Sequence, residues 1–162
     1  MFKLMKQVRG GDVNLQAIKG RVLGTGQAKN SSGCVDGASE AVIGLCAYAF
    51  GELNGRILLS LERHFKIAPN NKPALRKLIS DTFENPPRLK VSLSVIKKSR
   101  QRAGISSPHN DAHFLMNNLC AIAYESGNNG RGVLKSLIDI GKRAGLSQDE
   151  ILVIFRKTRL AA

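Results

Sequence analysis

Apolar residues recur at helical spacing through residues 38–66, ASEAVIGLCAYAFGELNGRILLSLERHFK. Side chains three and four positions apart share one face of a helix, and this spacing joins Val42, Leu45, Ala49 and Leu53. Before Gly51 the segment is apolar on nearly every side, so we expect it at the centre of the fold. Asn54 and Gly55 predict a bend or a break, because glycine lowers helix stability by about 1 kcal/mol relative to alanine.

A second helix is predicted over residues 73–83. Asn71 is its candidate N-cap, Pro73 stands in its first turn, and Pro86 lies beyond its end. The residues that this spacing turns inward are Leu75, Leu78, Ile79 and Phe83.

The pattern of residues 89–102 is ambiguous. Alternation of Leu89, Val91 and Leu93 fits a strand, whereas Leu89, Leu93 and Ile96 fit one helical face. A strand needs a neighbouring strand, and only the N-terminal segment could supply one. We therefore predict a helix from about Lys90.

Three more helices complete the prediction. Ser107 and Pro108 open one that Gly127 ends, with apolar residues at helical spacing between them. The last two are expected over residues 133–144 and 148–159. The chain is thus predicted to be mainly α, a compact bundle of five to seven helices with little sheet.

Glycine dominates the start of the chain, where six of the sixteen glycines fall within the first 33 residues. Asp12 could cap a short helix up to Leu23, and a hairpin turned at Gly10 and Gly11 is the alternative. We expect residues 1–33 to be a flexible or loosely packed basic segment, partly mobile, and residues 34–162 to be a single α-helical domain.

Positive charge is the strongest signal for function. The chain carries 25 Lys and Arg against 12 Asp and Glu, a net charge of +13. The excess is +7 within residues 67–106 alone, whereas residues 107–130 carry −2. Because each neutralised phosphate releases counterions, a surplus of this size predicts a nucleic-acid partner. With six Phe, two Tyr and no Trp, stacking on exposed rings is disfavoured.

One basic cluster lies in the sequence IKKSRQRAG. Its cations are Lys97, Lys98, Arg100 and Arg102, and Lys72, Arg76 and Lys77 could extend the same surface. On a helix the cluster spreads over about half of the circumference, which suits a phosphate backbone better than a single base. A solvated basic face without a partner is the alternative.

Residues 137–156 resemble a helix-turn-helix. Gly141 would allow a close helix crossing and Gly145 a tight turn, while Ser147 and Glu150 form a capping box that starts the second helix. The residues expected to supply buried contacts at this corner are Ile140, Ala144, Leu146, Ile151 and Ile154. Such a pair of helices reads DNA in some proteins, and in others it only packs.

The second helix of this pair does not fit base recognition well. Its first turn carries Asp149 and Glu150, whose charges would face phosphates, and Leu152 and Val153 stand where polar side chains read bases. The sequence ILVIF is expected to be partly buried, and its excess apolar surface predicts a homodimer or a place in a larger assembly.

The segment RAGIS, from Arg102, recurs as RAGLS from Arg143, forty-one positions later. A duplication would explain the match, and so would the chance recurrence of a helix stop. We favour the second explanation, because polar Asn110 and His113 in the first copy correspond to Ile151 and Ile154 in the second.

Cysteine and histidine give little sign of a metal or a cofactor. Cys34, Cys46 and Cys120 are widely spaced and are expected to be reduced thiols, which agrees with a cytoplasmic protein. His109 and His113 are spaced to face one metal ion, but the sequence offers no further ligand beside them, so no metal site is predicted. No apolar run reaches the roughly 20 residues of a membrane span.

Together these patterns predict a nucleic-acid-binding protein, with duplex DNA favoured over RNA and a regulatory or accessory role. The candidate contact residues are Lys72, Arg76, Lys77, Lys97, Lys98, Arg100, Arg102, Lys142, Arg143, Ser147, Gln148, Arg156, Lys157 and Arg159. The alternatives are a small helical RNA-binding or coating subunit of a ribonucleoprotein, and a protein-interaction factor or inhibitor that binds an acidic protein. No catalytic constellation or phosphate-binding loop is recognisable, so we do not expect an enzyme.

Overall fold

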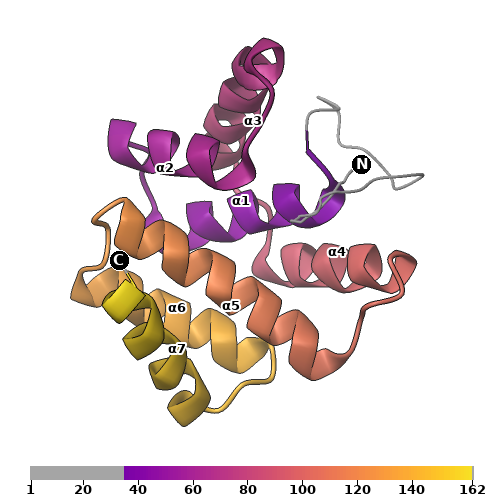
Figure 1. Cartoon of the computed structure of the whole chain (residues 1–162), viewed down its shortest axis with the longest axis vertical. Coiled ribbons are helices and arrows are strands. Elements are labelled where there is room, and N and C mark those ends of the chain that lie inside the picture. The colour runs from indigo at the N-terminus through magenta and orange to yellow at the C-terminus, as the bar shows by residue number, and fades with distance from the viewer. Residues whose placement is uncertain (1–34, 162) are drawn as a thin grey trace. The chain divides into compact units, whose positions relative to one another are not determined.

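The computed structural model describes residues 35–161, and all of the regular structure within them is helical (Figure 1). A short 3₁₀ turn, Pro69–Asn71, precedes the third helix. The α-helices are α1 (Gly37–Phe50), α2 (Gly55–Phe65), α3 (Lys72–Glu84), α4 (Leu89–Arg102), α5 (Pro108–Glu125), α6 (Arg131–Arg143) and α7 (Gln148–Ala161). The prediction of a mainly α protein with five to seven helices is confirmed, and the expectations for residues 1–33 lie outside the described residues.

The described residues divide into two compact units. One holds residues 35–40 and 65–78, and the other holds residues 41–64 and 79–161. The expectation of a single α-helical domain over residues 34–162 stays a prediction.

The smaller unit contains the first turn of α1 and the first half of α3. Asp36 begins α1, where its carboxylate accepts a hydrogen bond from the Ser39 backbone N–H at 2.7 Å. The expected cap Asn71 is the last residue of the 3₁₀ turn that leads directly into α3. Leu75 and Leu78 are buried, as their spacing predicts.

The larger unit is arranged around α5. This helix packs against α4, α6 and α7, and α6 also packs against α7. The α5 residues that the sequence turns inward are all buried, namely Ala112, Leu115, Leu119 and Ile122. Residues 41–47 of α1 are buried without interruption, which confirms the expectation drawn from their apolar surroundings.

The predicted break near Asn54 separates α1 from α2. The chain leaves α1 at Gly51, whose φ of +79° lies in the left-handed region that glycine tolerates best. Asn54 then caps α2, because its side-chain oxygen accepts a hydrogen bond from the Ile57 backbone N–H at 3.0 Å.

Residues 89–102 form helix α4, as predicted. Ser92 and Ile96 are buried on its inner face. The start of α4 lies very close to α1 at Gly44, where an added Cβ would stand 2.8 Å from Pro87 Cγ and 2.9 Å from Ser92 Oγ. A glycine in α1 therefore makes room for this helix.

The two RAG segments end their helices in the same way. Gly104 and Gly145 both have positive φ, and in each case the next residue donates a hydrogen bond to the carbonyl five positions earlier. After this cap the copies differ, since Ile105 is 53% exposed and Leu146 is 4% exposed. Both segments thus end a helix with the same cap, and the chance recurrence of such a helix stop remains the explanation that we favour.

Cys46 and Cys120 are buried free thiols, as expected of core residues. Burial raises the pKa of the Cys46 thiol above its usual range and that of Cys120 to about 12. Cys34 lies outside the described residues.

The crossing at Gly141 gives the first prediction. A Cβ at this position would stand 2.6 Å from Ile151 Cδ1 and 3.3 Å from Met116 Sδ, so Gly141→Ala should overpack the core and lower the free energy of unfolding by about 1–3 kcal/mol. Urea denaturation measures the change.

Gly132→Ala is the matched control, because Gly132 lies in the same helix and an added Cβ would meet nothing within 4 Å. It should raise stability by roughly 0.5–1 kcal/mol through helix propensity. Trimming the partner in Gly141→Ala/Ile151→Val should restore part of the loss, and an unchanged stability of Gly141→Ala would contradict the close crossing.

Candidate nucleic-acid interface

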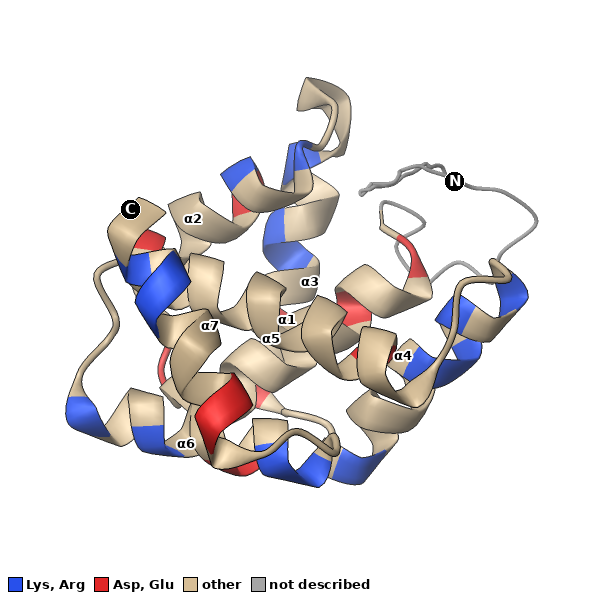
Figure 2. Ribbon diagram, turned by 60° about the horizontal axis from the view of Figure 1, so that its bottom comes forward, with Lys and Arg blue, Asp and Glu red and all other residues tan. Residues whose placement is uncertain are grey.

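The outer side of α4 carries cations and no acidic side chain (Figure 2). Lys90, Lys97, Lys98 and Arg102 are all exposed, and we call these four residues the α4 basic face. From Lys90 to Arg102 the face extends about 18 Å, at 1.5 Å for each helical residue. A row of this kind can follow a phosphate backbone without reading bases.

Arg100 does not belong to this exposed face. Its Nε lies 2.7 Å from Asp111 Oδ1, its guanidinium carbon is 4.5 Å from the centre of the Phe114 ring, and its side chain is only 13% exposed. Burial lowers the pKa of Arg100, while the hydrogen bond to Asp111 acts in the opposite direction. The structure therefore shows that Arg100 links α4 to α5. It does not lie on the exposed surface with Lys97, Lys98 and Arg102, as the sequence predicted.

Asp111 also binds a second partner, the hydroxyl of Ser106. The Ser106 hydroxyl donates a hydrogen bond to Asp111 Oδ2 at 2.6 Å, so both carboxylate oxygens are engaged. The loop between α4 and α5 is held by the same acid that receives Arg100.

The corner between α6 and α7 has the geometry that its residues predict, except that Ala144 is half-buried and is not one of the buried contacts. Gly141 is buried against Ile151, and Gly145 makes the turn with φ +104°. The capping box is formed in both directions, since Ser147 Oγ accepts from the Glu150 N–H at 3.2 Å and Glu150 Oε1 accepts from the Ser147 N–H at 2.9 Å. These bonds fix the direction in which α7 leaves the turn.

The surface of α7 is mixed. Gln148 and Asp149 are exposed in its first turn, and the exposed fractions of Leu152 and Val153 are 39% and 41%. The rest of the ILVIF sequence is buried, so the expectation of partial burial is confirmed. An acidic and apolar outer face is poorly suited to a helix that reads bases in the major groove.

Exposed cations lie on both helices of this pair. Lys142 and Arg143 are exposed at the end of α6, and Arg156, Lys157 and Arg159 are exposed in the second half of α7. Ser147, at the turn between the two helices, is also exposed.

Arg143 is partly neutralised by Asp139. Its Nε lies 3.2 Å from Asp139 Oδ1, and the Tyr48 hydroxyl donates to Asp139 Oδ2 at 2.9 Å. This hydrogen bond from Tyr48 is the main reason that the pKa of Asp139 lies below its usual value, and it raises the pKa of Tyr48 in turn.

Lys72, Arg76 and Lys77 are exposed on α3 in the smaller unit. They belong to a separate unit from the α4 basic face, so the predicted extension of that face onto α3 stays a prediction. Tyr48 is the one exposed Phe or Tyr ring among residues 35–161.

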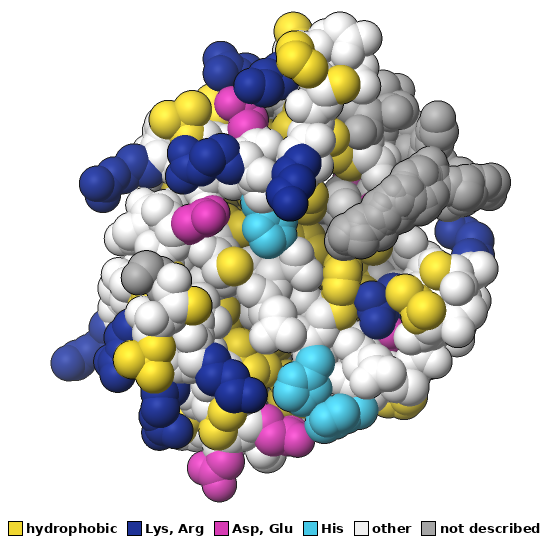
Figure 3. Space-filling model, in the orientation of Figure 1, with side chains coloured by type: hydrophobic (Ala, Val, Ile, Leu, Met, Phe, Trp, Pro, Cys, Tyr) yellow, Lys and Arg dark blue, Asp and Glu magenta, His cyan; other side chains and the backbone are white. Residues whose placement is uncertain are grey.

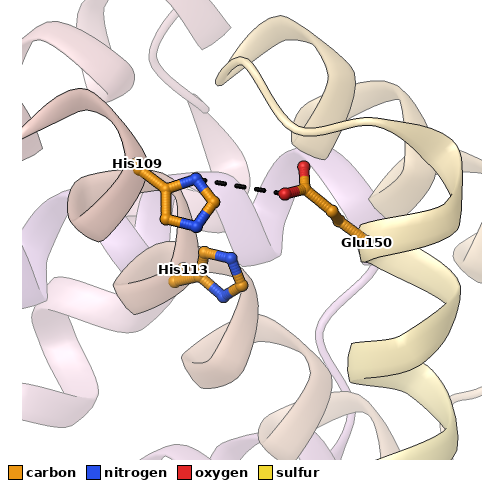
Figure 4. A group of neighbouring side chains, drawn as sticks. All are labelled: His109, His113 and Glu150. Carbon is orange, nitrogen blue, oxygen red and sulfur yellow. Dashed lines mark ion pairs between the residues drawn. The ribbon is translucent and has the colours of Figure 1, made fainter.

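Glu150 joins the two histidines, which the spacing of the sequence pairs with each other alone. His109 and His113 lie in the first two turns of α5, Glu150 lies in the first turn of α7, and one ligand atom from each lies within 4.8 Å of the others. Figure 4 shows both imidazole rings beside the carboxylate. No local sequence signal could bring Glu150 to His113, because the packing of α5 against α7 does so.

No protein-family model, no curated protein and no solved structure matches this chain. Within residues 35–161, no helix has the length and apolar character needed to cross a membrane.

The buried position of Arg100 gives a prediction for stability. Arg100→Met leaves Asp111 buried without its cation, and we expect the free energy of unfolding to fall by about 3–5 kcal/mol. Chemical denaturation measures the loss.

Arg102→Met, two positions away and exposed, is the control and should stay within about 0.5 kcal/mol of the wild type. The double variant Arg100→Met/Asp111→Asn should recover stability relative to Arg100→Met, because the uncompensated charge is gone. Equal effects of the two single variants would contradict a structural role for Arg100.

Proposed function

We propose that this protein binds nucleic acid through the phosphate backbone, that its preferred form is double-stranded DNA, and that it acts there as a regulatory or accessory factor. The observation that carries the proposal is that basic side chains are exposed far more often than acidic ones. Among residues 35–161, eighteen of nineteen Lys and Arg residues are exposed, against five of eleven Asp and Glu residues. Basic side chains are spread widely over the face drawn in Figure 3.

Internal partners explain part of this difference. Asp111 is held by Arg100, Asp139 by Tyr48 and Arg143, and Glu150 by the Ser147 backbone. Acids that are bonded to partners within the chain oppose an approaching polyanion less than free surface acids do. The outer surface is therefore more basic than the composition alone implies.

The choice of duplex over single strands rests on the aromatic residues. Proteins that hold single strands stack bases on exposed rings. Tyr48, the one exposed Phe or Tyr ring in the described part of the chain, is hydrogen-bonded to Asp139. A surface of cations without stacking platforms fits a duplex backbone.

The α4 basic face and the cations Arg156, Lys157 and Arg159 are the proposed phosphate anchors. Base contact, where it occurs, is expected from Ser147, Gln148 and Arg156, which are exposed at or along α7. Two buried free thiols fit a reducing compartment, and we place the protein in the cytoplasm on that ground.

We also propose that the protein forms a homodimer through α7. Leu152, Val153 and Leu160 are exposed apolar side chains on this one helix, and Leu160 is 78% exposed. A two-fold dimer would bury this face of α7 in both copies and would present two α4 basic faces to a duplex.

A salt titration of binding to duplex DNA, single-stranded DNA and RNA tests the proposal. The logarithm of the association constant should fall linearly with the logarithm of the salt concentration, with the duplex bound most tightly. Replacing Lys97, Lys98 and Arg102 by Gln should reduce the slope by about 3, because each lost phosphate contact removes about 0.9.

The control replaces three other exposed cations, Arg56, Arg131 and Lys135, by Gln. The net charge changes equally in both variants, so a smaller effect of the control locates the contact on α4. Equal slopes for the two variants would show that the phosphate contact does not lie on α4. Tighter binding of RNA than of duplex DNA would favour a coating subunit. No binding of any nucleic acid in dilute buffer would contradict the proposal.

Sedimentation velocity tests the dimer. Leu152→Glu should shift the protein to a monomer, because it places a charge in the proposed apolar interface. Ile105→Glu is the control, since Ile105 is an equally apolar side chain exposed outside α7. A wild-type protein that sediments as a monomer at all concentrations would contradict the dimer.

A further inference from the structure

We propose that His109, His113 and Glu150 form a binding site for a divalent transition-metal ion of the Zn²⁺ type. This inference is independent of nucleic-acid binding. It rests on three ligand-bearing side chains from two helices that meet at one place (Figure 4).

The donor atoms are already near one another. Their mutual separations are within 4.8 Å, the imidazole centres are 4.4 Å apart, and His109 Nδ1 lies 4.0 Å from Glu150 Oε2. In a tetrahedral zinc site, bonds of about 2.0–2.1 Å place neighbouring ligand atoms roughly 3.3 Å apart. The required closure is about 1.5 Å or less, and rotation of exposed side chains can supply it, since the His109 side chain is 64% exposed.

The capping box orients the carboxylate. Glu150 Oε1 accepts the Ser147 N–H at 2.9 Å, while Oε2 is the oxygen nearest to His109. This hydrogen bond is also the main reason that the pKa of Glu150 lies below its usual value. A ligand held by a backbone donor in this way loses little freedom when it binds a metal.

The spacing of the histidines fits the same purpose. His109 and His113 are four positions apart on α5, so their side chains lie on one face, about 5–6 Å apart at Cβ. Two imidazoles and one carboxylate are a ligand set that Zn²⁺ accepts, with water at the fourth position.

The surroundings of the site favour a metal ion that bonds to imidazole nitrogen over one that is held by electrostatic attraction alone. The site lies at the N-terminal ends of α5 and α7, where the helix dipole is positive and opposes a cation held only by electrostatics. Ca²⁺ and Mg²⁺ require several oxygen ligands, and this cluster offers one carboxylate. The site should therefore select Zn²⁺, Co²⁺ or Ni²⁺ over Ca²⁺ and Mg²⁺.

A bound ion would join the first turn of α5 to the first turn of α7. These turns are 41 positions apart between His109 and Glu150, so the metal would cross-link distant parts of the larger unit. Because the unfolded chain does not hold the three ligands together, binding should stabilise the folded state.

The test uses the full chain without an affinity tag, stripped with a chelator and freed of nucleic acid. Titration calorimetry with ZnCl₂ should give one site per chain, and CoCl₂ should develop the visible absorption of tetrahedral Co²⁺. With zinc at 100 times its Kd, the ratio of folded to unfolded protein should rise about 100-fold, which corresponds to a Tm increase of roughly 5–10 °C. Millimolar CaCl₂ or MgCl₂ should leave the Tm unchanged.

The variants His109→Gln, His113→Gln and Glu150→Gln should each abolish or greatly weaken the heat and the Tm increase. Glu150→Gln is the most informative, because Gln can still close a capping box and so removes the charged ligand while keeping the helix start. His64→Gln is the control, since His64 is the remaining histidine and is hydrogen-bonded to Asn118 on another side of α5. Zinc binding that survives in the double variant His109→Gln/His113→Gln, or no zinc binding by the wild type, would overturn the proposal.

Discussion

The arrangement of the larger unit depends on the close approach of three helices at Gly141. An added Cβ at this position of α6 would collide with Ile151 of α7 and would touch Met116 of α5. Because the position has no side chain, α7 can lie against both other helices and bury Ile151, Ile154 and Phe155. The turn at Gly145 and the capping box at Ser147 then set the direction of α7, and with it the position of Glu150 beside the histidines of α5.

The same packing determines which charges reach the surface. Helices that meet closely bring Asp111 to Arg100 inside the protein and Asp139 to Tyr48 at its surface, so both acids have partners within the chain. The lysines and arginines have long side chains whose charged ends can remain in water while their stems lie along the protein. The resulting surface is more basic than the sequence average, and this difference connects the fold to the proposed binding of phosphate.

Local chemistry was sufficient to predict most of the helices and their ends, whereas residues 89–102 fitted a strand as well as a helix and were assigned to a helix because only the N-terminal segment could supply a partner strand. The break at Asn54, the cap at Ser107 and the corner at Gly145 are each determined by residues within one or two turns, and each is observed. Arg100 was not predicted correctly in this way. Its spacing groups it with Lys97 and Lys98, whereas in the structure it turns inward to bind Asp111, eleven positions along the chain. Helical spacing gives the face of a side chain but not its partner.

The sequence by itself determined the helical class, the helix boundaries and the surplus of cations, because propensity, capping and charge are properties of near neighbours. The tertiary structure decided that Arg100 is largely buried against Asp111, that six of the eleven Asp and Glu residues among residues 35–161 are withdrawn from full exposure, and that Glu150 meets His109 and His113. Those outcomes depend on contacts between residues far apart in the chain, and such contacts exist only once the hydrophobic faces of the helices have packed together.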